Sequence, residues 1–108
     1  MHRKKPLSPN ALRRAMARAD DKLALARERL AALEPGGTPE RPIEVASASL
    51  VEPRAQSAPC LRCGGPLRID EHTAESIGGL RLRVVHARCA QCASPRLLYY
   101  RVGSALPS

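Results

Sequence analysis

Four cysteines in two closely spaced pairs constrain this chain more than any other feature of its sequence. Cys60 and Cys63 stand in PCLRCGG, and Cys89 and Cys92 stand in HARCAQCASP, which gives the pattern C-x2-C-x25-C-x2-C. A two-residue gap within a tight turn lets both sulfurs point at one centre, where peptide N–H groups of the turn can hydrogen-bond them. Two such turns, brought together by a hairpin, supply four soft ligands in a tetrahedron, as structural zinc requires. The spacing therefore predicts a metal site built from all four cysteines.

The rest of the chain argues against other uses of paired cysteines. A thioredoxin-like dithiol needs a strand–helix–strand context, and none is visible in the sequence. Two disulfides need an oxidising compartment, whereas the basic start of the chain never reaches the apolar run of a signal peptide. We therefore expect a cytoplasmic protein with reduced thiols. Four thiolates can also hold iron, as in rubredoxins, but those proteins are usually acidic and rich in aromatic residues, and this chain has a net charge of +8.

These motifs resemble the zinc-ribbon family, which includes small bacterial proteins of unknown role. The matching elements are the cysteine turns at 60–64 and 89–92, Gly64 after the first pair, the turn at Gly78–Gly79 and a closing strand at 96–102. The resemblance covers residues 58–103. It implies one structural Zn2+ bound by Cys60, Cys63, Cys89 and Cys92.

Two positions depart from the pattern of that family. Glycine commonly follows the second cysteine of each turn, because the backbone there takes a left-handed conformation. Only glycine adopts this conformation without a steric penalty. Gly64 fits, but the second turn has Ala93, so that turn is either shaped differently or strained by about 1 kcal/mol. Ribbons in transcript-cleavage factors carry an Asp-Glu pair near the hairpin tip. Here Asp70–Glu71 precedes the turn, and we do not expect that activity.

Strand-like runs separated by turn residues predict a three-stranded antiparallel sheet in the C-terminal part. The candidate strands are 66–72, 80–88 and 96–102, of which 80–88 alternates apolar residues with arginine. The chain contains no Phe and no Trp, and a domain so poor in large side chains usually needs a metal to stay folded. The expected fold class is a small metal-stabilised β domain, a zinc ribbon at 58–103, preceded by one long N-terminal helix and a flexible linker.

The long helix is predicted at residues 9–34. Ser8 and Pro9 supply an N-cap and a first-turn proline, and EPGG ends the helical pattern. Its apolar residues follow a 4-3-4-3-4-3 spacing, which is the seam of a coiled coil: Leu12, Met16, Ala19, Leu23, Ala26, Leu30 and Leu33. The helix is thus either a solvated amphipathic helix or a self-association helix, and the two alanines weaken the second interpretation.

The remaining segments have the composition of irregular chain. MHRKKPLS at 1–8 predicts a disordered basic tip, and 104–108 predicts a disordered tail. Residues 35–57 are rich in Pro, Ser and Ala and predict a flexible linker, in which IEVASASLV could form a transient strand.

The histidines are the other possible metal ligands. Four thiolates already close a tetrahedral shell, so we expect His72 and His86 on the solvent side of the domain. His86 should share a strand face with Val84, near the cysteines, and His2 belongs to the basic tip.

Two functions from different classes remain, since no catalytic constellation or phosphate-binding loop is visible and we expect no enzyme. The positive charge favours binding of DNA or RNA, as in a transcription-associated module. The expected contacts are arginines on the strands and cysteine turns, and tyrosines that could stack on a base: Arg62, Arg68, Arg81, Arg83, Arg88, Arg101, Tyr99 and Tyr100. Alternatively, the arginines only keep exposed strands soluble. The chain would then be an adaptor that self-associates or docks on another protein through its helix. We expect no membrane partner and no small-molecule substrate.

Overall fold

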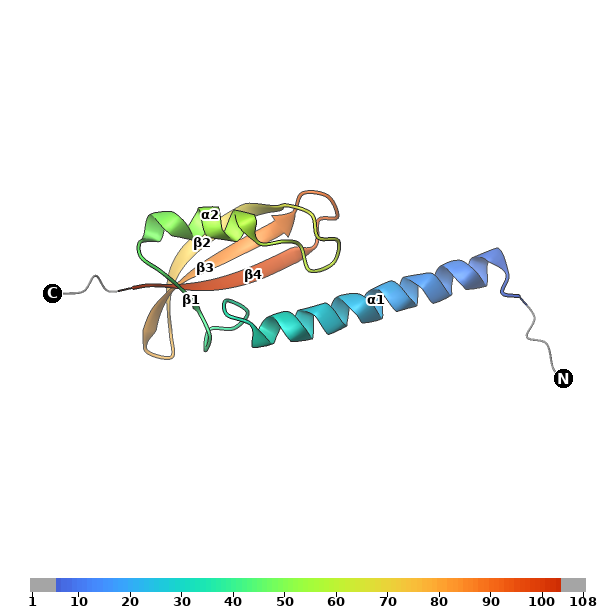
Figure 1. Ribbon diagram of the computed structural model, residues 1–108, viewed down its shortest axis with the longest axis horizontal. Helices are drawn as coiled ribbons and strands as arrows, with labels where there is room; N and C mark the ends of the chain where they lie inside the picture. The colour runs from blue at the N-terminus through green and yellow to red at the C-terminus, as the bar shows by residue number, and fades with distance from the viewer. Residues whose placement is uncertain (1–5, 104–108) are drawn as a thin grey trace.

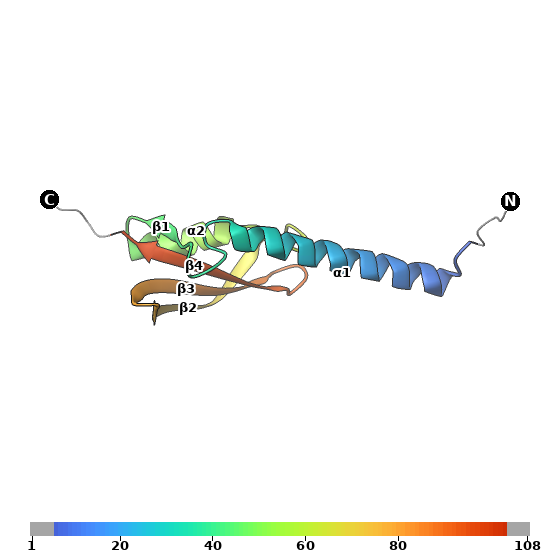
Figure 2. The ribbon, with the colours of Figure 1, turned by 90° about the horizontal axis from the view of Figure 1, so that it is seen from below.

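The computed structural model describes residues 6–103, which form one long helix and a four-stranded sheet with a short second helix against it (Figure 1). The elements are α1 (Pro9–Leu33), β1 (Ile43–Val45), a 3-10 turn (Ala48–Leu50), α2 (Val51–Ser57), β2 (Leu67–Ile77), β3 (Leu80–Cys89) and β4 (Pro95–Val102). Helix α1 runs beside one end of the domain and extends beyond it (Figures 1 and 2). The disorder expected at 1–8 and 104–108 falls mostly on residues outside the described range.

Helix α1 confirms the predicted N-terminal helix, and both of its ends have local causes. The Ser8 hydroxyl accepts a hydrogen bond from the Ala11 amide at 3.1 Å, and Pro9 occupies the first helical position. At the other end the chain folds back so closely that a Cβ on Gly37 would lie 2.1 Å from the Ala31 carbonyl oxygen. Only glycine permits this reversal, which brings the following residues alongside the sheet.

The sheet has the order β1-β4-β3-β2, so the expectation of three strands is corrected to four. The antiparallel pairs β2–β3 and β3–β4 agree with the predicted strands, whereas β1 adds a parallel partner to the free edge of β4. Strand β2 also runs further than expected, to Ile77, and contains a bulge between Ile69 and Glu71. Gly78 and Gly79, with φ of 58° and 82°, form the predicted hairpin turn.

The flexible linker expected at 35–57 is also corrected, because most of this segment belongs to the folded domain. It supplies β1, the 3-10 turn and α2, and it buries Val45, Val51 and Ala55. Pro53 lies in the first turn of α2, where its missing N–H interrupts no intrahelical hydrogen bond. The proline content therefore did not indicate irregular chain at this position.

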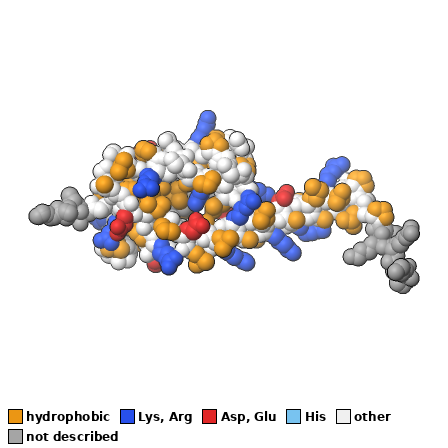
Figure 3. Space-filling view, viewed as in Figure 1, with side chains coloured by type: hydrophobic (Ala, Val, Ile, Leu, Met, Phe, Trp, Pro, Cys, Tyr) orange, Lys and Arg blue, Asp and Glu red, His pale blue; other side chains and the backbone are white. Residues whose placement is uncertain are grey.

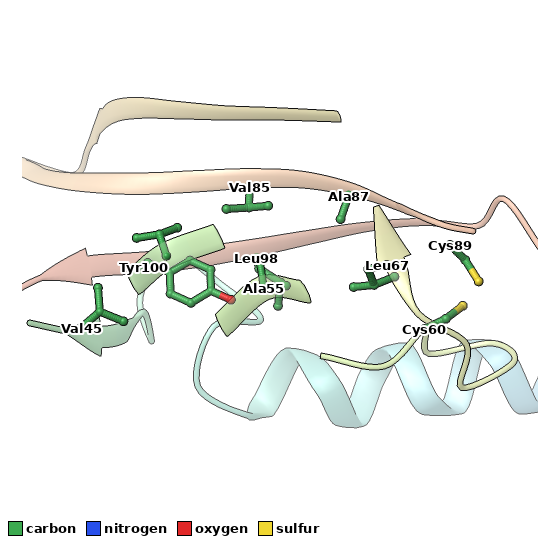
Figure 4. Close-up of a cluster of buried hydrophobic side chains, with 10 residues drawn as sticks. Val45, Ala55, Cys60, Leu67, Val85, Ala87, Cys89, Leu98 and Tyr100 are labelled. Carbon is green, nitrogen blue, oxygen red and sulfur yellow. The ribbon is translucent and has the colours of Figure 1, made fainter. Parts of the chain in front are cut away.

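The core lies between α2 and one face of the sheet (Figure 4). Its buried members are Val45, Val51, Ala55, Cys60, Leu67, Val85, Ala87, Cys89, Leu98 and Tyr100. Because side chains alternate across a strand, Val85, Ala87 and Cys89 of β3 all point to this face. The core thus ends in two cysteines, which places the metal-binding chemistry at one end of the sheet.

We predict that Val51→Ala lowers the free energy of unfolding by about 2 kcal/mol, because Val51 is 0% exposed under α2. Leu50→Ala is the matched control: the neighbouring Leu50 is 43% exposed, and its truncation should change stability by less than about 0.5 kcal/mol. Urea denaturation of the metal-loaded proteins measures both. Equal, small effects would mean that residues 43–57 are not part of the cooperative fold.

Candidate metal centre

Four sulfur atoms converge at the end of the sheet that lies next to α1. Cys60 and Cys63 stand in the turn before β2, Cys89 is the last residue of β3, and Cys92 stands in the turn between β3 and β4. The four Sγ atoms lie within 4.8 Å of one another, with 3.6 Å between those of Cys60 and Cys92 and 3.4 Å between those of Cys63 and Cys89. A tetrahedral ion with bonds of about 2.3 Å requires about 3.8 Å between sulfurs, whereas a disulfide requires about 2.05 Å. These are free thiols positioned to hold one metal ion.

The two cysteine turns have the same backbone structure, and we call them the first knuckle (residues 60–65) and the second knuckle (residues 89–94). In the first, the Cys60 amide donates to the Gly65 carbonyl and the Gly64 amide donates to the Cys60 carbonyl, both at 2.9 Å. In the second, the Cys89 amide donates to the Ser94 carbonyl at 2.9 Å, and the Ala93 amide donates to the Cys89 carbonyl at 3.0 Å. Each knuckle buries its first cysteine and exposes its second. Figure 4 shows the buried sulfurs of Cys60 and Cys89 pointing toward each other.

Backbone amides of both knuckles donate to the buried sulfurs, as the spacing predicted. The Arg62 amide donates to Cys60 Sγ at 3.4 Å, and the Gln91 and Cys92 amides donate to Cys89 Sγ at 3.3 and 3.4 Å. A hydrogen bond to a sulfur favours its charged form. At Cys89 the amide donors lower the pKa of the thiol and so favour the thiolate, which is the form that binds metals.

The surroundings separate the pKa values of the thiols in the metal-free protein. The Ser94 side chain and backbone lower the pKa of Cys92 to about 6. The Cys92 amide, followed by the Gln91 amide, lowers the pKa of Cys89. A Gly65 amide hydrogen bond lowers the pKa of Cys63, but its sulfur neighbours and burial outweigh this contact and raise that pKa to about 12. The cluster thus holds thiolates and at least one tightly bound proton together at neutral pH, as expected when close sulfurs cannot all ionise without a cation.

The second knuckle contains the strain that Ala93 suggested. Ala93 has φ of 63° and Gly64, at the equivalent position, has φ of 76°. Among the described residues, Ala93 is the one non-glycine residue with positive φ. The two knuckles therefore have the same shape, and Ala93 adopts a conformation that costs an alanine about 1 kcal/mol or more.

Gly65 is required for a different reason, which is close approach. A Cβ at this position would lie 2.7 Å from Gln91 Oε1 and 3.2 Å from Cys89 Sγ. The first knuckle thus packs directly against a sulfur of the second: the flexible end of Gln91 could move aside, but a Cβ here would press on Cys89 Sγ.

Helix α1 contacts the first knuckle through an arginine that the sequence did not identify as part of the site. Arg27 Nη1 donates to the carbonyl oxygens of Arg62 at 2.9 Å and Leu61 at 3.4 Å. Arg62 in turn forms an ion pair with Asp21 at 3.1 Å. Both contacts join α1 to the peptide between Cys60 and Cys63. An arginine more than 30 residues before its acceptors leaves no local pattern in the sequence, so only the fold could reveal it.

The histidines and the acidic pair lie outside the cysteine cluster. His86 is exposed, as expected, and its position in β3 places it on the same strand face as Val84. His72 instead lies against α2, with its side chain 14% exposed and its Nδ1 3.2 Å from Glu52 Oε2. The expectation of a solvent-side His72 is therefore corrected. Asp70 sits at the bulge of β2 and accepts a hydrogen bond from Arg88 at 3.3 Å.

The strand register divides the predicted nucleic-acid contacts between the two faces of the sheet. Arg83 pairs with Tyr100, so Arg83 and Arg81 point to the face that α2 covers in part. Arg68 pairs with Arg88, and these two point with Arg101 to the opposite face. No face therefore carries all of them.

The two tyrosines have different environments. Tyr100 is 1% exposed, and burial raises the pKa of its hydroxyl, so its proposed role in base stacking is corrected to a core role. Tyr99 points to the other face and is half-buried. Adjacent tyrosines on a strand always face opposite ways, and the sequence alone did not show which one faces the core.

A scan of protein-family models and searches of curated proteins and solved structures find no match to this chain. Within residues 6–103, no helix has the length and apolar character needed to cross a bilayer.

The two knuckles offer a matched pair of substitutions. We predict that Ala93→Gly raises the free energy of unfolding by about 0.5–1 kcal/mol, because it removes left-handed strain at the expense of some entropy in the unfolded chain. Gly64→Ala should lower that free energy by about 1 kcal/mol, since nothing lies within 4 Å of the added Cβ and only the backbone conformation resists it. Urea denaturation of the metal-loaded proteins tests both. A stabilising Gly64→Ala or a destabilising Ala93→Gly would contradict this account.

Proposed function

We propose that this chain is a non-enzymatic zinc-ribbon protein in which one structural Zn2+, bound by Cys60, Cys63, Cys89 and Cys92, secures a nucleic-acid-binding or transcription-associated module. The observation that carries the proposal is the convergence of four sulfurs from two equivalent knuckles. Soft thiolate ligands in a tetrahedron favour zinc, which has no redox chemistry to be controlled by the protein. Iron would bind the same four sulfurs, and elemental analysis separates the two metals.

A structural role follows from the composition of the shell. Four protein thiolates complete a tetrahedron and leave no coordination position for water or substrate, so the ion would not act as a Lewis acid. Cys60 and Cys89 are members of the core as well as ligands. The ion would therefore stabilise the packing of α2 on the sheet directly.

Charge supports the nucleic-acid role. Four thiolates and one Zn2+ contribute a net charge of −2, which leaves the formal charge of +8 at about +6. Helix α1 carries six Lys/Arg against three Asp/Glu, and its exposed cations besides Arg27 are Arg13, Arg14, Arg18, Lys22 and Arg29. The space-filling view shows Lys and Arg side chains projecting along this helix (Figure 3). Because phosphate contacts need only positive charge within reach, α1 is a better candidate surface than the divided sheet.

A second candidate function, a protein-interaction adaptor, is supported by the apolar side of α1. Leu12, Leu23, Leu30 and Leu33 are between 48% and 66% exposed. A helix that leaves so many large apolar side chains in water is typical of one that packs on a partner.

The zinc proposal predicts one Zn2+ per purified chain and a C-terminal domain that unfolds when the metal is removed. Because metal binding displaces thiol protons, its affinity should depend on pH. The raised pKa of Cys63, about 12, means that its proton is still bound at pH 8. The apparent Kd for Zn2+ should therefore rise at least tenfold for each pH unit from about pH 8 to 6. The rise should become steeper below about pH 6, where Cys92 also takes up a proton.

A competition titration against a chelator whose own pKa values are known measures the Zn2+ affinity at each pH. Circular dichroism recorded on the same samples shows whether the domain is folded. Cys89→Ser should lose the metal and the fold of residues 58–103. One iron per chain would overturn the zinc assignment. A domain that keeps its structure after chelation would overturn the structural role.

The nucleic-acid role predicts binding to generic DNA or RNA that weakens steeply with salt. Replacing Arg14, Arg18 and Lys22 together by Gln should reduce the slope of log K against log salt by up to about three, because each phosphate contact contributes about 0.7–0.9. Arg54→Gln, an exposed arginine on α2, is the control that should leave the slope unchanged. Absence of binding at low salt would overturn the nucleic-acid role and leave the zinc site untouched.

A further inference from the structure

Helix α1 has two faces with different environments. Ala24 and Ala31 are 9% and 7% exposed, and with Arg27 they mark the face directed at the domain. The seam residues lie elsewhere on the same helix. At about 100° per residue, the centre of the seam falls about a third of a turn away from Ala24 and Ala31. The domain therefore leaves most of the seam uncovered, although Leu30 lines a hollow beside the first knuckle.

The seam remains open to solvent along its whole length. Its five large side chains have the following exposed fractions: Leu12 48%, Met16 59%, Leu23 50%, Leu30 63% and Leu33 66%. Its two small members, Ala19 and Ala26, are exposed as well. Figure 3 shows apolar side chains reaching the surface along α1 between the charged ones.

We propose that the seam is covered by the same seam of a second copy of this chain, with the two α1 helices antiparallel. This inference rests on the second candidate function, interaction through α1, and names its partner. A two-fold pair of this kind buries the same surface on both copies, so a self-complementary seam is what it requires.

The order of large and small residues favours the antiparallel orientation. When Met16 of one copy faces Leu33 of the other, Ala19 faces Leu30 and Leu23 faces Ala26. Every alanine then meets a leucine, so the layers between the helices have similar volume. A parallel pair would instead place Ala19 on Ala19 and Ala26 on Ala26, and two of its layers would be under-packed.

The charges beside the seam agree with this orientation on one edge. In the antiparallel register Arg13 of one copy approaches Glu34 of the other, whereas Arg27 on the same edge is already engaged with the first knuckle. On the other edge Lys22 approaches Arg29, which is unfavourable. A parallel pair would place Lys22 beside Arg27 and Arg29 beside Glu34. Arg29 therefore weakens one orientation and stabilises the other, which makes it a diagnostic position.

The decisive comparison uses two leucines of nearly equal exposure on the same helix. Leu23, in the seam, is 50% exposed, and Leu25, on another side of the helix, is 51% exposed. Sedimentation of the full zinc-loaded chain should show a monomer–dimer equilibrium. Leu23→Ala should raise the dimer Kd at least about tenfold, because both copies lose a buried side chain, whereas Leu25→Ala should leave it within about twofold. Circular dichroism and zinc content confirm that both variants are folded.

Charge variants test the orientation. Arg13→Glu should weaken the dimer, and adding Glu34→Arg should restore it. Arg29→Glu should tighten an antiparallel dimer, since it relieves the contact with Lys22, and it would weaken a parallel one. A weaker Arg29→Glu dimer overturns the antiparallel arrangement.

Three further outcomes overturn the proposal as a whole. They are a monomer at concentrations of about 1 mM, an assembly larger than a dimer, and equal effects of Leu23→Ala and Leu25→Ala. Zinc content and salt-dependent nucleic-acid binding are measured independently of dimerisation. A failure of the dimer proposal is therefore distinguishable from a failure of the zinc-ribbon proposal.

Discussion

The approach of four cysteine sulfurs to one point is the contact on which the rest of this domain depends. The core beneath α2 is built without Phe or Trp, and two of its ten buried members are the first cysteines of the knuckles. So small a core contributes little stability by itself. A metal ion held by both knuckles would tie the start of β2 to the connection between β3 and β4, so that three strands would share one anchored end. Strand β1 and helix α2 complete the fold, with β1 at the edge of the sheet and α2 over the core.

The local features of the sequence predicted most of this site but only part of the fold. Cysteine spacing, the glycine turn and the N-cap of α1 are short-range patterns, and the structure agrees with the predictions drawn from them. Strand β1 was expected at most as a transient strand, because its three residues are stabilised by β4, more than 50 residues later. Helix α2 was missed because Pro53 suggested irregular chain, although the first helical turn accepts proline. Arg27 and the burial of Tyr100 depend on contacts between distant segments, which no local pattern records.

Helix α1 contacts the candidate metal centre on one side and exposes apolar and charged side chains on the other. One face touches the first knuckle through Arg27 and Asp21, while the other side carries exposed leucines between exposed cations. Apolar and charged residues on one helix give it two ways to engage partners, through burial and through phosphate contacts. These ways are compatible, because paired helices would still leave the outer arginines in solvent.

The hydrogen bonds of Arg27 also have a mechanical consequence. They lie about 18 residues, or about 27 Å, from the first turn of α1, and they attach the helix to the peptide between Cys60 and Cys63. A rotation of the first knuckle by about 10° would displace the far end of the helix by about 5 Å. If the helix and the first knuckle move as one body, small rearrangements at the sulfurs would become large displacements of the exposed side chains at the far end of α1.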